Sequence, residues 1–469
     1  MIKINSNDNV AVEIKSGHKT ALSDIKAGEN VIKYGFSIGV ATADIKAGEQ
    51  VHVHNLRSAI KSENEYNYTP EISRNQTKKA GEFLAYLRAD GRVGIRNEIW
   101  IINTVGCVNK ASEKIALEAG KIYAGKTDGI FAVTHPYGCS QLGSDHENTK
   151  LILAGFAHHP NAAGVLILGL GCENNSVCDF KKLLGNYDEK TVKFLVTQDC
   201  ENEVEEGVKL IGEIVSEIGN SERQPVELDK LVIGLKCGGS DAFSGITANP
   251  LVGRISDRIC KHGGTTILTE TPEMFGAETI LMNRCESEIV FQKTVKLINN
   301  FKQYFISHKQ EIYENPSPGN KAGGITTLEE KSLGCVQKGG TSAVTDVLDY
   351  GRRVNKKGLV LLDGPGNDIV STTALTAAGC HIIIFTTGRG TPLGAFAPTL
   401  KISSNSELVK KKANWTDYDA GELLVGKSMK EAEQELWDLI LSVAEGKTRT
   451  KSEINDYREF AIFKNGVTL

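Results

Sequence analysis

The length, composition and charge of the sequence limit the class of protein that it can encode. The chain has 469 residues, of which 40% are hydrophobic and 24% are charged, a balance that is typical of a globular protein and excludes a disordered chain. A formal net charge of −4 excludes the basic surface that nucleic acid or anionic lipid would need. The first residues lack the apolar core of a signal peptide, and the longest apolar runs have only the length of a strand. We therefore expect a cytoplasmic protein with no membrane partner.

Residues 1–60 contain an internal repeat that predicts a small β-domain. The hexapeptide Asp-Ile-Lys-Ala-Gly-Glu occurs at residues 24–29 and again at residues 44–49. Two copies of a strand, glycine turn and strand favour an approximately two-fold symmetric unit, because a solenoid needs about three or more repeats. His18 and Lys19 follow a glycine in a turn of this domain, where an imidazole and an ammonium could contribute to a site.

The rest of the chain alternates short apolar runs with helical segments. The strand-like runs occupy residues 101–105, 131–134, 165–170, 194–197, 231–235, 265–269, 359–362 and 382–387. Such alternation predicts two Rossmann-like α/β units with mostly parallel sheets. We predict a polar linker at residues 61–80, a first unit at residues 81–225 and a second unit at residues 226–469, with the boundary in a polar stretch around Pro225.

Nearly every predicted strand is followed at once by a loop of glycines and polar or sulfur-bearing side chains. Ligands bind beyond the carboxyl ends of parallel strands, so we expect these loops to form a site. The loop after residues 231–235 is the densest, because it contains Lys236, Cys237, Ser240 and Asp241 beside glycines that let a ligand approach the backbone. Three arginines near the start of the first unit are suited to binding the carboxylate of an acidic substrate. They are Arg88, Arg92 and Arg96.

The ten cysteines include no CxxC pair, which excludes a disulfide framework and a zinc ribbon. Cys139, Cys172 and Cys237 lie among glycine, asparagine, aspartate or histidine, and we predict a ligand or redox role for them. Small buried hydrophobes are predicted at Cys260, Cys285 and Cys380. Two glycine-rich loops, at residues 169–174 and 364–367, lack the third glycine of the dinucleotide fingerprint, and no Gly-Lys-Ser/Thr follows a glycine loop. We therefore expect neither NAD nor ATP as a cofactor.

The loops also resemble those of a known family in their amino-acid sequences and in their order along the chain. The segments that carry the resemblance are residues 135–143 (His-Pro-Tyr-Gly-Cys-Ser-Gln-Leu-Gly), 169–175 (Gly-Leu-Gly-Cys-Glu-Asn-Asn), 237–241 (Cys-Gly-Gly-Ser-Asp), 317–324 (Ser-Pro-Gly-Asn-Lys-Ala-Gly-Gly) and 387–392 (Thr-Gly-Arg-Gly-Thr-Pro). Together they resemble the altronate/galactarate dehydratase family over nearly the whole chain. The first segment and the ending at residues 463–469 resemble the altronate branch. Residues 1–60 resemble the SAF, or β-clip, domain of the family.

The resemblance implies a hydro-lyase that converts D-altronate to 2-dehydro-3-deoxy-D-gluconate and water, supported by iron(II) or by manganese in its place. Removal of the proton beside a carboxylate builds an ene-diolate, whose charge a divalent cation stabilises, and thiolates and imidazoles suit iron(II). Galactarate or another aldarate or aldonate is the alternative substrate. An iron–sulfur dehydratase with cysteine ligands and a non-catalytic metabolite-binding module are the alternative classes. The sequence leaves the oligomeric state open, a homo-oligomer included.

We assign candidate roles to the residues of these motifs. The candidate metal ligands are Cys139, Cys172, Cys237 and Glu270, with His18 considered beside them. The candidates for proton transfer are His18, Lys19, His135, His146, Lys236 and Asp241. The substrate carboxylate is assigned to Arg389, whose guanidinium can bind it bidentately, and to Lys321. Further substrate contacts are predicted at Asn320, Ser240 and Thr391.

Overall fold

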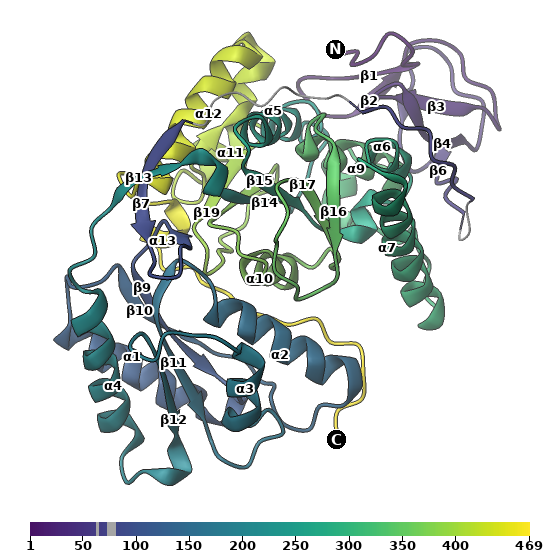
Figure 1. Cartoon of the computed structure of the whole chain (residues 1–469). Helices are drawn as coiled ribbons and strands as arrows, with labels where there is room; N and C mark the ends of the chain where they lie inside the picture. Colours follow the sequence, from purple (N-terminus) through teal and green to yellow (C-terminus); the bar gives the residue numbers. More distant parts are fainter. Residues whose placement is uncertain (62–64, 73–80) are drawn as a thin grey trace.

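The chain folds into a small N-terminal β-domain and two α/β units (Figure 1). The computed structural model describes residues 1–61, 65–72 and 81–469. The predicted fold class is confirmed, because small antiparallel sheets at the N-terminus are followed by a four-stranded and a seven-stranded parallel sheet. The predicted linker at residues 61–80 falls partly outside the described residues, which omit 62–64 and 73–80.

Two three-stranded antiparallel sheets form the N-terminal domain. One contains β1 (Val10–Val12), β2 (Lys19–Ala21) and β5 (Gln50–Val51), and the other contains β3 (Asn30–Lys33), β4 (Phe36–Ala41) and β6 (Leu56–Arg57). The two copies of the repeat face each other, because Ile25 and Ile45 exchange backbone hydrogen bonds of 2.9 and 2.8 Å. The lysine of each copy also pairs with the aspartate of the other copy. The predicted two-fold relation is therefore confirmed.

The first α/β unit is built on a parallel sheet in the order β10-β9-β11-β12. Its strands are β9 (Glu98–Asn103), β10 (Gly129–Val133), β11 (Ala162–Gly169) and β12 (Val192–Val196). Every residue of β9 and β11 is buried, as expected for continuous apolar runs in a sheet covered on both faces. The helices α1 (Asn109–Ile122) and α4 (Glu203–Ile218) pack on one face, and α2 (Gly143–Ala157) and α3 (Val177–Leu184) pack on the other.

The second α/β unit is built on a parallel sheet in the order β16-β17-β15-β14-β18-β19-β20. Its strands are β14 (Val232–Cys237), β15 (Thr265–Leu268), β16 (Val344–Leu348), β17 (Gly358–Leu362), β18 (Ile382–Thr387), β19 (Thr399–Ser403) and β20 (Tyr418–Asp419). The strands β15, β18 and β19 are buried along their whole length. Because all seven strands run parallel, their carboxyl ends share one edge, where a site is expected.

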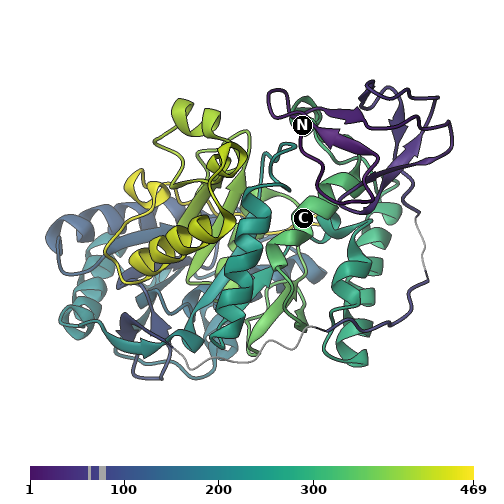
Figure 2. The same cartoon turned by 90° about the horizontal axis from the view of Figure 1, so that it is seen from above.

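Nine helices are described in the second α/β unit. They are α5 (Ala248–Lys261), α6 (Glu278–Met282), α7 (Glu288–Ser307), α8 (Pro318–Ala322), α9 (Leu328–Cys335), α10 (Asp368–Ala377), α11 (Ser406–Lys411), α12 (Met429–Ala444) and α13 (Lys451–Ile454). Helix α10 packs against α2 of the first unit, and the N-terminal domain lies against the second unit through β4 and α9 (Figure 2). Within the described residues, each helix is too short or too polar to cross a membrane.

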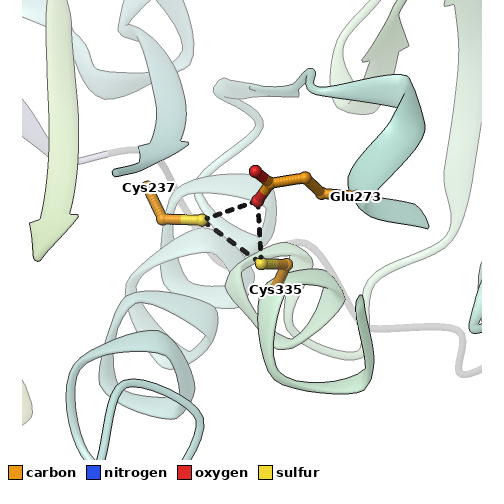
Figure 3. A group of neighbouring side chains, drawn as sticks. All are labelled: Cys237, Glu273 and Cys335. Atoms are coloured by element: carbon orange, nitrogen blue, oxygen red, sulfur yellow. Dashed lines mark hydrogen bonds between the residues drawn. The ribbon is translucent and has the colours of Figure 1, made fainter. Parts of the chain in front are cut away.

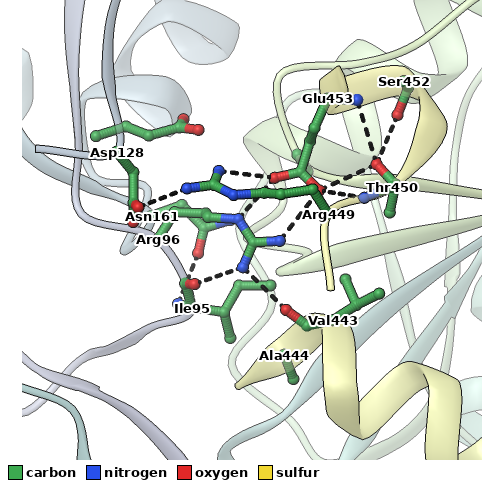
Figure 4. A network of polar contacts seen from close by, with 12 residues as sticks. Ile95, Arg96, Asp128, Asn161, Val443, Ala444, Arg449, Thr450, Ser452 and Glu453 are labelled. Atoms are coloured by element: carbon green, nitrogen blue, oxygen red, sulfur yellow. Dashed lines mark hydrogen bonds and ion pairs between the residues drawn. The ribbon is translucent and has the colours of Figure 1, made fainter. Parts of the chain in front are cut away.

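A buried arginine ties the two α/β units together (Figure 4). Arg96 follows β8 (Val93–Gly94), which pairs with β7 (Glu82–Leu87), the partner of β13 (Gln224–Glu227). Its guanidinium donates to both carboxylate oxygens of Glu453, at 2.7 and 3.0 Å, and to the carbonyl of Val443 at 2.9 Å. The side chain is fully buried. The expectation that Arg96 binds an acidic substrate is therefore wrong, because its hydrogen bonds go to the second unit.

Several buried histidines predict a loss of stability in mild acid. His381 accepts a hydrogen bond from Val232 N at Nδ1, and its Nε2 lies 2.7 Å from the carbonyl of Val93, so the ring is held neutral. Burial lowers the pKa of His381, and likewise of His135, to about 4. An exposed histidine in the unfolded chain binds its proton near pH 6.5. Between about pH 6.5 and pH 4 the unfolded chain therefore binds more protons, and the free energy of unfolding falls as the pH falls.

We expect the free energy of unfolding, measured with a denaturant, to drop between pH 7 and pH 5 by about 2 kcal/mol for each such histidine. The variant His381→Asn should lose part of this pH dependence, whatever its stability at pH 7. The matched variant His54→Asn, in which an exposed histidine is replaced, should keep it. An equal pH dependence in all three proteins would contradict the assignment.

Candidate active site

The carboxyl edge of the seven-stranded sheet carries a buried network of charged side chains. Lys236, near the end of β14, donates to the carboxylate of Glu270, to Asp368 Oδ1 at 2.8 Å and to the carbonyl of Cys237 at 2.7 Å. Burial alone would lower the pKa of Lys236, but Glu270 and Asp368 raise it. Lys236 is therefore an ammonium ion that acts as a hydrogen-bond donor at neutral pH.

Glu270 occupies the centre of this network. It follows β15 in the left-handed conformation, with φ of 73°, which is strained for a residue with a side chain. Its carboxylate accepts hydrogen bonds from the backbone of Cys237 at 3.0 Å and from Lys338 Nζ at 3.1 Å, in addition to Lys236. Backbone strain of this kind persists where surrounding contacts hold it, and it occurs often at functional sites.

Cys237, Glu273 and Cys335 form a compact buried group beside Glu270 (Figure 3). The two Sγ atoms are 3.3 Å apart, and Glu273 Oε2 lies 3.4 Å from Cys237 Sγ and 3.1 Å from Cys335 Sγ. Two sulfurs and a carboxylate at these separations could hold one metal ion that accepts both sulfur and oxygen ligands. This donor set fits a metal cofactor.

Lysine side chains balance the charge of this group. Lys338 Nζ lies 2.7 Å from Cys237 Sγ, and Lys331 Nζ lies 2.8 Å from Glu273 Oε1. Burial alone would raise the pKa of Glu273, but the ammonium groups of Lys331, Lys236 and Lys338 lower it to about 2. The hydrogen bond with Cys237, together with burial, raises the pKa of Cys335. Glu273 is thus ionised, whereas Cys335 is a thiol that must lose its proton to bind a metal.

The loop after β14 is organised by the carboxylate of Asp241. It accepts hydrogen bonds from Ser244 N and Oγ, each at 2.9 Å, and from two groups beyond β19, Ser404 Oγ at 2.7 Å and Asn405 Nδ2 at 2.9 Å. Gly388 is required beside it, because a β-carbon at that position would overlap the Asp241 carboxylate. Asp241 is therefore a well-satisfied acceptor that fixes the shape of the loop.

Ser240, next to Asp241, faces α8. Its carbonyl accepts a hydrogen bond of 2.8 Å from Asn320 Nδ2, so the structure brings these two predicted substrate residues together. The Ser240 hydroxyl is buried and has no hydrogen-bond partner among the described residues. A buried hydroxyl without a partner is costly, and such a group is available to a ligand.

The N-terminal domain is fixed to the second unit by a buried ion triad. Glu330, on α9, accepts from Lys19 Nζ and from Lys33 Nζ, each at 2.8 Å, and all three side chains are buried. Burial alone would raise the pKa of Glu330, but the two lysines lower it well below its usual range. Lys19 Nζ also donates to the carbonyl of Gly324 at 2.8 Å. Lys19, which we predicted as a catalytic residue, thus has structural partners.

The turn of the N-terminal domain that carries His18 lies against the Asp241 loop. The preceding residue, Gly17, packs against Ala242 and against the turn that follows α8. The rings of His18 and His52 meet edge to face with centroids 5.3 Å apart, and His52 Nε2 lies 3.1 Å from the carbonyl of Lys321. His18 Nδ1 is buried and has no hydrogen-bond partner among the described residues. The turn thus places an imidazole with an unused nitrogen over the strand-end loops.

Three family models match successive parts of the chain. Residues 2–59 match the family model "Altronate/galactarate dehydratase SAF domain", residues 85–219 match "D-galactarate dehydratase/Altronate hydrolase, second domain", and residues 228–468 match "D-galactarate/Altronate dehydratase, C-terminal". The chain belongs to the altronate/galactarate dehydratase family.

Its relatives include two altronate dehydratases. The chain is 51% identical to "Altronate dehydratase" of Escherichia coli strain K12, with 100% of this chain and 99% of the relative covered. It is 52% identical to "Altronate dehydratase" of Bacillus subtilis strain 168, with 97% and 93% covered. It is 30% identical to "Galactarate dehydratase (L-threo-forming)" of E. coli, with 96% and 94% covered.

Within this family fold, two of the predicted catalytic histidines lie on the first α/β unit. His135 is buried after β10, with Nε2 2.8 Å from the carbonyl of Asn103 and Nδ1 accepting from Tyr137 N at 3.1 Å. Both ring nitrogens are therefore engaged by the backbone. His146 lies on α2, and its Nδ1 has no hydrogen-bond partner among the described residues. The structure does not bring either ring into the network around Glu270.

The predicted metal ligands are divided between the two units. Cys237 and Glu270 are together, with Cys237 Sγ 3.6 Å from Glu270 Oε2. Cys139 and Cys172 are exposed in loops that follow β10 and β11 of the other sheet. Within the described residues, the one group that brings three candidate ligand atoms within 4.8 Å of one another comprises Cys237, Glu273 and Cys335. The structure therefore does not place Cys139 and Cys172 beside Cys237.

The remaining predicted substrate residues lie around the carboxyl edge of the seven-stranded sheet. Arg389 has an exposed side chain, and its backbone donates to the carbonyl of Gly239 at 2.8 Å. It lines an open cavity of about 510 Å³ whose other basic residues are Lys410 and Lys411. Thr391 is half-buried, with Oγ1 accepting from Leu393 N. Lys321 is half-buried on α8, and its carbonyl contacts the His52 ring.

Sequence reasoning missed four residues of the network, namely Glu273, Lys331, Cys335 and Lys338. A weak signal for three of them exists, because Lys331, Cys335 and Lys338 recur at the spacing that places side chains on one face of a helix. Lys331 and Cys335 lie on α9, and Lys338 lies in the 3₁₀ turn at Val336–Gly339 that continues it; two buried lysines beside a buried cysteine are unusual. Glu273 follows Glu270 by one turn, which is a second indication.

Proposed function

We propose that this chain is a cytoplasmic hydro-lyase that dehydrates D-altronate to 2-dehydro-3-deoxy-D-gluconate and water. The choice of substrate is supported by sequence identity. The chain is 51% and 52% identical to two altronate dehydratases and 30% identical to a galactarate dehydratase, over nearly complete chains. The chain is thus clearly more similar to the two altronate dehydratases than to the galactarate dehydratase, which favours altronate over galactarate as the substrate.

We propose that the sugar acid binds where the N-terminal domain meets the loops at the carboxyl edge of the seven-stranded sheet. Two buried polar atoms without partners among the described residues, Ser240 Oγ and His18 Nδ1, lie on the two sides of this junction. A polyhydroxylated substrate offers the hydrogen bonds that such atoms need. His18 is our candidate for proton transfer, since an imidazole can exchange a proton near neutral pH.

We further propose that iron(II), or manganese(II) in its place, assists the reaction. Cys237, Glu273 and Cys335 would hold the ion, with Glu270 beside them. When bound, such an ion supplies positive charge that stabilises the developing ene-diolate. The donor chemistry supports iron over magnesium, because magnesium prefers oxygen ligands alone. Lys236 and Lys338 form ion pairs with Glu270 in this buried setting and would balance the charge of its carboxylate.

A panel of sugar acids tests this proposal. The full-length protein, loaded anaerobically with Fe(II), Mn(II) or Mg(II), should dehydrate D-altronate with a kcat/KM at least about tenfold above that for galactarate, a ratio that corresponds to about 1.4 kcal/mol of discrimination. Fe(II) should support more activity than Mg(II). Formation of the 2-keto product can be followed directly. Preference for galactarate would move the protein to the other branch, and turnover of no sugar acid would reject an enzyme.

We expect Arg389 to bind the carboxylate of the substrate. Arg389→Lys keeps the charge but loses the bidentate geometry, so kcat/KM should fall about tenfold, and Arg389→Ala should lower it about a hundredfold. The melting temperature should stay nearly unchanged because the side chain is exposed. Lys410→Ala, on the rim of the same cavity, is the matched control and should change kcat/KM little. A parallel loss of stability and activity would assign Arg389 to the fold instead.

A further inference from the structure

The four-stranded sheet of the first α/β unit has a cysteine after each of its strands. Cys107 follows β9, Cys139 follows β10, Cys172 follows β11 and Cys200 follows β12. The first three are exposed, although a free cysteine is among the residues most often buried. In the order β10-β9-β11 their strands are neighbours, so the three cysteines lie on adjacent loops at one edge of the sheet.

These three loops are hydrogen-bonded to one another. The Cys107 loop contacts the Cys139 loop, since Gly106 N donates to the carbonyl of Tyr137 at 2.8 Å. The Cys139 loop contacts the Cys172 loop, since Ser140 N donates to Asn174 Oδ1 at 3.0 Å. Asn175 joins all three, because its backbone donates to the carbonyl of Gly138 and its side chain donates to the carbonyl of Thr104.

The chain approaches itself closely at this edge. A β-carbon at Gly138 would overlap the carbonyl of Thr104, so glycine is needed for the Cys139 loop to lie against the loop of Cys107. The C-terminal residues cover the same loop, because Leu469 N donates to the carbonyl of Ser140 at 3.0 Å. The hydrogen bonds among the three strand ends and the C-terminus hold the loops of these cysteines in place. A loop that is only solvated would not need such contacts.

The sulfur atoms of these cysteines have different hydrogen-bond partners. Gln198 Nε2 lies 3.7 Å from Cys172 Sγ, where it donates a weak hydrogen bond to the sulfur, and donors of this kind tune metal-bound sulfur. Cys200, after the fourth strand, is half-buried and donates to the carbonyl of Thr197 at 3.5 Å. Burial raises its pKa. Cys200 therefore behaves as a structural thiol, and three cysteines remain available as ligands.

We infer that Cys107, Cys139 and Cys172 bind an iron–sulfur cluster at the carboxyl edge of the four-stranded sheet. Iron–sulfur clusters are held by cysteine thiolates on fixed loops, with hydrogen bonds to the sulfurs, and soft thiolates favour iron over harder cations. The site is distinct from the group of Cys237, Glu273 and Cys335, and it does not rest on the choice of substrate. Three cysteines leave one iron of a four-iron cluster without a protein thiolate, open to a carboxylate or hydroxyl group.

Anaerobic reconstitution with Fe(II) and sulfide tests the inference on the full-length protein. The wild type should bind iron and acid-labile sulfide in nearly equal amounts and gain the broad visible absorption of a cluster. Cys107→Ser, Cys139→Ser and Cys172→Ser should each lose the sulfide and the absorption. Cys178→Ser, which replaces another exposed cysteine on α3, and Cys237→Ser should retain both. Iron without sulfide in the wild type, or retention of sulfide by the three loop variants, would overturn the inference.

Protection from alkylation gives a readout that needs no variant. Before reconstitution, a maleimide should modify Cys107, Cys139, Cys172 and Cys178, and peptide mass spectrometry identifies each site. After reconstitution, the first three should be protected while Cys178 still reacts. Continued labelling of all four in the loaded protein would also overturn the cluster. The outcome is separate from that of the sugar-acid panel, because a protein without altronate turnover can still bind sulfide and protect its thiols.

Discussion

Replacement of His18 by alanine is expected to lower kcat/KM for D-altronate at least about a hundredfold, the usual scale for loss of a proton-transfer group. The imidazole sits at the junction of the N-terminal domain and the Asp241 loop, and its Nδ1 has no hydrogen-bond partner among the described residues. No buried ion pair is lost in this variant, since the triad of Lys19, Lys33 and Glu330 stays intact. The melting temperature should therefore remain close to that of the wild type.

Two controls separate catalysis from folding. His54→Ala removes an exposed histidine from the same domain and should leave turnover unchanged. In His18→Ala, the pH profile of kcat/KM should show one ionisation fewer than in the wild type. Replacement of a purely structural residue would leave the number of ionisations unchanged. Undiminished turnover by His18→Ala would show that the N-terminal domain contributes no catalytic group, and the acid or base would then have to be sought on the second unit.

Deletion of the N-terminal domain would test the role of His18 less clearly than the point substitution does. A chain without residues 1–59 would leave the carboxylate of Glu330 buried near the interface with neither of its lysines. Glu329 would lose the backbone donor of Ala59 and the hydroxyl of Ser58 in the same step. Inactivity of such a truncated chain could therefore come from a disturbed α9, which also carries Cys335. Point substitutions keep this helix in place.

The fold was predictable from the sequence because its signals are local. Continuous apolar runs such as β11 and β18 are buried on both faces, as parallel strands require. The repeat at residues 24–29 and 44–49 showed the symmetry of the N-terminal domain, because each copy carries both the lysine and the aspartate that pair across the symmetry axis. These patterns need no knowledge of contacts between distant segments.

The site was predictable only where a charged or sulfur-bearing side chain lies next to the end of a strand. Cys237 ends β14 and Glu270 follows the neighbouring strand β15, so sequence order and sheet order together place them near one another. Cys335 lies 98 positions from Cys237 in the chain and reaches it through α9, and no local pattern encodes that contact. Lys19 was predicted as a catalytic group because it stands beside His18, but its partner is Glu330, 311 positions away.

The variant Glu330→Gln is expected to destabilise the folded protein by about 3–5 kcal/mol, because it leaves the ammonium groups of Lys19 and Lys33 buried without a counter-charge. Their side chains are 0% and 1% exposed, so water cannot replace the lost carboxylate. Glutamine has nearly the shape of glutamate, and the loss therefore reports charge rather than packing. Denaturant unfolding at pH 7 measures it directly.

Glu329→Gln is the matched control, because Glu329 lies on the same helix at the same interface but accepts hydrogen bonds from Ala59 N and Ser58 Oγ instead of from lysines. An amide oxygen can accept these bonds, so a much smaller loss is expected. The triple variant Lys19→Met, Lys33→Met, Glu330→Leu removes all three charges and should recover most of the stability, since apolar side chains often replace a buried ion triad without cost. If the triple variant is as unstable as Glu330→Gln, packing at the interface dominates. If Glu330→Gln costs no more than Glu329→Gln, the triad contributes little to the attachment of the N-terminal domain.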